Sequence, residues 1–83
     1  MFFVYAIKSN KDGRIYVGLT QNIESRINYH NKGWNTSTKG YIPWELIYHE
    51  PAENRIIARS REKYLKSGIG KEWLKAYIIS KEL

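Results

Sequence analysis

The sequence of 83 residues contains no cysteine and only eight acidic residues, one of which is an aspartate. The absence of cysteine excludes disulfides, thiolate metal sites and cysteine nucleophiles. The carboxylates are scattered along the chain, whereas a two-metal nuclease needs several carboxylates that converge on its ions. Any metal chemistry therefore has to rest on a single carboxylate.

The chain also lacks a long hydrophobic run. The apolar stretch at residues 1–7 ends at Lys8. A membrane span needs about 20 residues, and a secretion signal needs a basic start and a longer apolar run. We therefore expect a soluble, cytoplasmic protein with no membrane partner. Hydrophobic residues make up 42% of the sequence, which favours one folded domain over residues 1–83 rather than disorder.

Basic residues outnumber acidic ones by fourteen to eight, and they are unevenly distributed. Residues 55–75 contain seven basic and two acidic residues, a net charge of +5, whereas residues 1–54 carry +1. A basic stripe on a helix is typical of phosphate binding. A solvated helix face has the same composition, so composition alone leaves both interpretations open.

Apolar periodicity predicts two strands followed by a helix in the first half of the chain. Residues 2–9 and 14–20 favour strands, and Asp12-Gly13 between them is a hairpin signal. Helical spacing then runs from an N-cap at Asn22 to Gly33.

The second half predicts a strand and two helices. We expect a strand over residues 44–50 that ends at Pro51, then helices over 53–67 and roughly 71–81, separated by a break at 68–70. The predicted fold class is α+β, with a small three-stranded antiparallel sheet flanked by helices in the order ββαβαα.

Several side chains stand out, although each has an ordinary explanation. Glu62 lies alone among cations, which is also typical of a helix ion pair with Arg59 or Lys66. Arg26 and His30 share a helix face because they are four residues apart, and such a pair is usually a surface feature.

The tryptophans also have two explanations. Trp34, Trp44 and Trp73 are able to stack on nucleobases. Large aromatic residues in a small domain are more often core residues or loop anchors.

In this order and spacing, the motifs resemble the GIY-YIG nuclease family over roughly residues 2–78. The two strand motifs of that family match Phe3-Val4-Tyr5 and Tyr16-Val17-Gly18. Its first-helix arginine and histidine match Arg26 and His30, and the glutamate of a later helix matches Glu62. Thr38-Lys39 and Pro43-Trp44 are similar to its loop and third-strand start. Phe3 replaces the glycine of the first motif, and Lys39 stands where arginine is common.

The resemblance implies a DNA phosphodiesterase that uses a single Mg²⁺ or Mn²⁺ ion held by Glu62. Tyr16 would be the general base and Arg26 would hold the phosphate, while Tyr5 and His30 would orient water or relay the proton. Gly18 would be structural. The implied nucleic-acid contacts are Lys39, Arg55, Arg59, Arg61, Lys63, Lys66 and Lys71.

The expected partners are a branched or damaged DNA duplex and a protein that targets the enzyme. Two alternatives stay open. One is a non-catalytic nucleic-acid-binding module with the same fold. The other is a basic protein–protein adaptor, which would show no salt-dependent affinity for nucleic acid.

Overall fold

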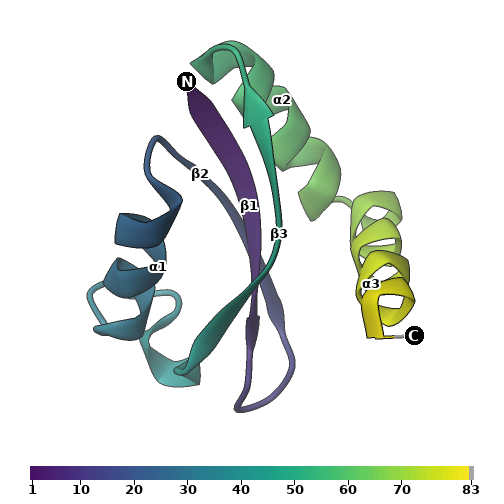
Figure 1. The fold of residues 1–83 in the computed structure, drawn as a ribbon. Helices are drawn as coiled ribbons and strands as arrows, with labels where there is room; N and C mark the ends of the chain where they lie inside the picture. Colours follow the sequence, from purple (N-terminus) through teal and green to yellow (C-terminus); the bar gives the residue numbers. More distant parts are fainter. Residues whose placement is uncertain (83) are drawn as a thin grey trace.

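A computed structural model describes residues 1–82, so Leu83 of the expected domain lies outside the described residues. A three-stranded antiparallel sheet in the order β2-β1-β3 forms the centre. The strands are β1 (Phe2–Ser9), β2 (Ile15–Thr20) and β3 (Trp44–Ala52). Figure 1 shows α1 (Ile23–Asn31) on one side of the strands and α2 (Arg55–Lys66) and α3 (Gly68–Glu82) on the other. The predicted α+β fold and the order ββαβαα are confirmed.

Local chemistry explains the hairpin and the first helix. Gly13 takes a positive φ of 82° in the turn, a conformation that glycine adopts without steric cost. The Asn22 side chain caps α1 by accepting a hydrogen bond from the Ser25 N–H at 3.0 Å. Gly33 follows the helix with a φ of 79°, as is common after a helix C-terminus.

The third strand is longer than predicted, because Pro51 does not end it. β3 continues to Ala52, and Pro51 pairs with Phe3 of β1. Proline is tolerated here because β3 is an edge strand, and the outer side of an edge strand needs no N–H donor.

The predicted break between the last two helices is present, but it lies at Ser67 and not at residues 68–70, because α3 begins at Gly68. The Ser67 hydroxyl accepts a hydrogen bond from the Gly70 N–H at 3.2 Å, which satisfies one donor of the first turn. The preceding helix begins two residues later than predicted, where the Asn54 side chain accepts from the Ile57 N–H at 3.0 Å. A short 3-10 helix, η1 (Lys39–Tyr41), lies within the predicted loop.

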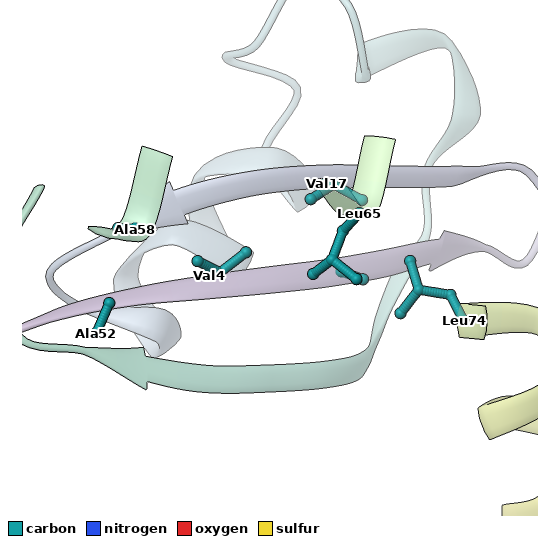
Figure 2. Close-up of a cluster of buried hydrophobic side chains, with 7 residues drawn as sticks. Val4, Val17, Ala52, Ala58, Leu65 and Leu74 are labelled. Atoms are coloured by element: carbon teal, nitrogen blue, oxygen red, sulfur yellow. The ribbon is translucent and has the colours of Figure 1, made fainter. Parts of the chain in front are cut away.

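Both faces of β1 are buried, so the sheet has a core on each side. On the α2 and α3 side, Figure 2 shows Leu65 and Leu74 with Val4 and Val17 of the strands. On the other side, Tyr5, Ile7 and Trp44 pack with residues of α1 and of the segment that precedes β3. None of the helices within residues 1–82 has the length and hydropathy needed to cross a bilayer.

Candidate active site

Tyr5 occupies the centre of β1, directly opposite Gly18 of β2. A Cβ atom added to Gly18 would lie 2.6 Å from the Tyr5 hydroxyl oxygen and 2.8 Å from its ring carbon Cζ. The phenol therefore lies across the space that a side chain at position 18 would fill. This explains why the second strand motif ends in glycine.

A buried chain of hydrogen bonds connects Tyr5 to two other elements. The Tyr5 hydroxyl is 2.8 Å from His30 Nε2, and His30 Nδ1 is 2.8 Å from Thr38 Oγ1. Arg26 Nε donates a longer bond of 3.4 Å to the Tyr5 oxygen. β1, α1 and the loop before η1 thus meet in one polar network inside an apolar cluster.

The electrostatics of the network keep His30 neutral. Burial, together with the nearby charge of Arg26, lowers the pKa of His30 to about 4. A neutral imidazole has one donor and one acceptor nitrogen. Arg26 donates to the Tyr5 oxygen. If the Tyr5 hydroxyl then donates to His30 Nε2, and His30 Nδ1–H donates to Thr38, all three hydrogen bonds point in one direction along the chain.

Tyr5 is also neutral at ordinary pH. Burial raises the pKa of Tyr5 to about 12 and outweighs the opposing hydrogen bond from Arg26. The negative charge of Glu62, on α2, raises the pKa of Tyr5 in the same direction as burial, but it is the weakest of these influences.

Tyr16 lies on β2 beside the buried chain, and its ring packs edge-on against His30 with centroids 5.0 Å apart. The side chain is half-buried. Its hydroxyl makes no hydrogen bond within residues 1–82, and no buried side-chain oxygen or nitrogen in that range lacks a partner. The hydroxyl is therefore open to solvent and available to a bound water or phosphate.

Glu62 projects from α2, the helix that packs against β1 and β2. Its side chain is only 11% exposed, yet it forms ion pairs with Lys66 at 3.3 Å and Arg59 at 3.6 Å. The ordinary helix ion pair is thus present. Both cations are about half exposed, so they are able to turn away when another cation binds the carboxylate.

The donor set fits a hard cation that keeps most of its water. Among the side chains of residues 1–81, no three His, Asp or Glu gather as they would in an all-protein metal cage. Mg²⁺ dehydrates reluctantly and is commonly bound through one or two carboxylates plus substrate phosphate. Glu62 of α2 offers one such carboxylate. Zinc, which takes three or four protein ligands, does not fit.

Most of the basic residues singled out in the sequence are exposed. One of them differs from the others, because Arg61 donates two hydrogen bonds to the Glu50 carboxylate of β3, at 2.9 and 2.8 Å. Its charge is neutralised within the fold, so we do not include it in a binding surface. The exposed members of the set are Lys39, Arg55, Arg59, Lys63, Lys66 and Lys71.

Thr38 belongs to the network, although the sequence does not mark it as a site residue. It lies in a loop motif, yet its side chain is fully buried against His30. The Trp44 indole N–H donates to the Thr38 carbonyl oxygen at 2.9 Å and holds the loop in place. The only signal in the sequence was the position of a threonine shortly before Pro43-Trp44.

Known proteins share this architecture. A family model described as the GIY-YIG catalytic domain matches residues 1–75. A UPF0213 protein of Clostridium perfringens (strain 13 / Type A) is 45% identical over 67 residues, covering 80% of this chain and 71% of that protein. A UPF0213 protein of Staphylococcus aureus (strain N315) is 35% identical over 66 residues, covering 78% of this chain and 79% of that protein.

A solved structure is also similar. The solution NMR structure of a UPF0213 protein from Bacillus halodurans aligns with a TM-score of 0.55 and 29% identity, covering 92% of this chain and 84% of that chain. The matched family region contains every residue of the Arg26–Tyr5–His30–Thr38 network, together with Tyr16, Gly18 and Glu62. The chain therefore belongs to the GIY-YIG family of nucleases, among the small UPF0213 proteins.

Proposed function

We propose that this protein is a divalent-metal-dependent endonuclease that hydrolyses DNA phosphodiester bonds. Its expected substrate is a branched or damaged duplex, and a protein partner would target it. The observation that carries the proposal is the buried Arg26–Tyr5–His30 network beside the open hydroxyl of Tyr16. Because the chain belongs to a nuclease family, we interpret these neighbouring groups as the binding site for the scissile phosphate.

Arg26 would bind the scissile phosphate. Only Nε of its guanidinium contacts Tyr5, and the group lies over the Tyr29 ring with Cζ 4.3 Å from the centroid. The two terminal nitrogens are left to donate to phosphate oxygens. Negative charge builds on those oxygens during an in-line displacement, and a preorganised cation stabilises it.

Tyr16 would act as the general base and, as phenolate, take a proton from the attacking water. Tyr5 is unsuited to this role because burial raises its pKa to about 12 and its oxygen already bonds with His30 and Arg26. His30 has no exposed surface and uses both ring nitrogens. We therefore assign Tyr5 and His30 as positioning residues for Arg26 and Tyr16.

Glu62 would hold the metal ion, with Lys66 and Arg59 released toward flanking phosphates. When bound, the ion would offset negative charge on the phosphate and on the departing oxygen. The exposed cations of α2 would contact the phosphates on either side of the cleaved bond.

Cleavage of end-labelled flapped, branched and plain duplex DNA, with Mn²⁺ or EDTA, tests the proposal. The matched variants are Glu62→Gln and Glu72→Gln, because Glu72 is an exposed glutamate that pairs, among the described side chains, only with Lys75 on the same helix. We expect metal-dependent cleavage that Glu62→Gln abolishes and Glu72→Gln preserves. Binding of DNA without cleavage by the wild-type protein would contradict the proposal and favour a non-catalytic binding module.

A further inference from the structure

The three tryptophans have different environments, and Trp34 is the most exposed of them. Trp44 is 4% exposed and belongs to the core. Trp73 is 41% exposed, and its ring stacks on that of Tyr77 with centroids 5.5 Å apart. Trp34, in contrast, is 64% exposed, which is unusual for so large an apolar side chain in a small domain.

Trp34 is exposed but its position is fixed. Its backbone N–H donates to the Tyr29 carbonyl oxygen at 3.3 Å, immediately after the positive-φ turn at Gly33. Its ring meets the Tyr29 ring edge-on at 6.0 Å. The ammonium group of Lys32 lies over the Trp34 ring, 5.0 Å from its centroid. The end of α1 therefore presents an oriented aromatic ring with a cation over one face.

This surface lies next to the phosphate site proposed above. The Tyr29 ring that contacts Trp34 also carries the Arg26 guanidinium, whose Cζ is 4.3 Å from the Tyr29 centroid. A phosphate-binding cation and an exposed indole thus flank the same tyrosine. A nucleotide has an anionic phosphate, which suits the cation, and an aromatic base, which suits the indole.

We propose that Trp34 is a stacking platform for an unpaired nucleobase next to the phosphate held by Arg26, with Lys32 contacting a neighbouring phosphate. The inference rests on the proposed function and narrows its substrate to DNA with unpaired bases near the cleaved bond. A base inside a duplex is stacked on both faces, so it cannot lie on the indole until it leaves the helix. Trp34 then distinguishes unpaired from paired strands because it contacts the base. The cations contact only the phosphate backbone, which both kinds of strand share.

The test is equilibrium binding in EDTA, followed by fluorescence anisotropy, with three labelled probes. These are a single-stranded oligodeoxynucleotide, the same strand in a full duplex, and a strand of abasic deoxyribose phosphates. The variants are Trp34→Ala, Trp34→Phe and, as a matched control, Ile79→Ala, which truncates a side chain that is 60% exposed on α3.

We expect Trp34→Ala to raise the Kd for the single strand at least about tenfold, or about 1.4 kcal/mol. This lies within the range for stacking of one base. The Kd for the abasic strand and the duplex should not change, Trp34→Phe should recover most of the loss, and Ile79→Ala should match the wild type. An equal loss on abasic and base-bearing strands, or no loss on either, would overturn the inference while leaving the nuclease proposal intact. A wild-type protein that neither binds nor cleaves any DNA would overturn both.

Discussion

At the scale of single residues, the charge state of His30 links the site to the stability of the fold. The residue is fully buried, with both ring nitrogens hydrogen-bonded. Burial and the charge of Arg26 lower its pKa to about 4, whereas a histidine of the unfolded chain titrates near 6.5. Because the unfolded chain binds the proton more readily, acid favours unfolding.

The free energy of unfolding should therefore be constant above pH 6.5 and fall as the pH drops toward 4, by up to about 3 kcal/mol. Urea denaturation at a series of pH values measures this. His30→Gln should lower the stability but reduce its dependence on pH. His49 is an exposed histidine on β3, and His49→Gln should leave the pH dependence as in the wild type. Arg61 holds the pKa of Glu50 below its usual range, so protonation of this carboxyl also lowers the free energy of unfolding at the acid end of the series. A wild-type protein with constant stability from pH 6.5 to 5 would contradict the account.

Gly18 gives a second prediction at the residue scale. Gly18→Ala places a methyl group 2.6 Å from the Tyr5 oxygen, and Tyr5 cannot move without losing its bonds to His30 and Arg26. We expect a loss of about 1–3 kcal/mol in unfolding free energy, as for other overpacked cores, together with reduced cleavage. Gly40→Ala is the matched control, because no atom lies within 4 Å of an added Cβ there. Equal effects of the two substitutions on thermal unfolding would count against the proposed packing of Tyr5 on Gly18.

At the scale of elements, the close join of α2 and α3 depends on Gly70. An added Cβ there would overlap the Tyr64 carbonyl oxygen and lie 2.5 Å from Leu65 Cα. These are backbone atoms of α2, so α3 would have to shift and withdraw Leu74 from the core. At Gly68, two residues earlier, an added Cβ meets nothing within 4 Å.

We therefore expect opposite effects from two similar substitutions in the first turn of α3. Gly70→Ala should destabilise the protein by about 2 kcal/mol or more, through backbone overlap and loss of core contacts. Gly68→Ala should be neutral or stabilise it by up to about 1 kcal/mol, because alanine favours a helix over glycine. Urea denaturation of both variants checks this, and a stable Gly70→Ala protein would show that α3 is not held against α2 as described.

The sequence predicts elements well where the signal is local. The Asp12-Gly13 turn and the Asn22 cap act on neighbouring residues, so the hairpin and α1 could be predicted. The effects of Pro51 and of residues 68–70 could not be predicted locally. The effect of Pro51 depends on the strand order, and that of residues 68–70 on the close contact with α2. Residues that are distant in sequence but contact each other were harder still. Nothing near Arg61 indicates its bond to Glu50, and nothing near Thr38 indicates that it is buried against His30.

At the scale of the whole molecule, the buried polar network and most of the positive charge lie on different sides of the sheet. The Arg26–Tyr5–His30–Thr38 network lies on the α1 side of the sheet, within the cluster around Tyr5 and Trp44. Most of the excess positive charge lies on α2 and α3, on the other side of the strands (Figure 1). Glu62 projects from α2, and its negative charge adds weakly to the burial that raises the pKa of Tyr5.

This arrangement predicts how salt affects binding. Lys63 is exposed on α2 and makes no ion pair with the side chains of residues 1–81, so it is available to neutralise a phosphate. Lys63→Gln should reduce the slope of log K against log salt for duplex DNA by about 0.9, the value expected for one lost phosphate contact. Lys81→Gln, near the far end of α3, should leave the slope unchanged. Titrations at several salt concentrations in EDTA measure both slopes, and an unchanged slope for Lys63→Gln would remove α2 from the binding surface.

The most direct test of the central claim is the single-turnover cleavage rate of Tyr16→Phe with saturating Mg²⁺, compared with the wild type. Tyr64→Phe, which removes a hydroxyl from a half-exposed tyrosine of α2, is the control. Removing a general base typically costs about 10²–10⁴-fold in rate. We predict a loss in that range for Tyr16→Phe with DNA affinity and thermal stability unchanged, and a wild-type rate for Tyr64→Phe. Cleavage by Tyr16→Phe at the wild-type rate would contradict the account.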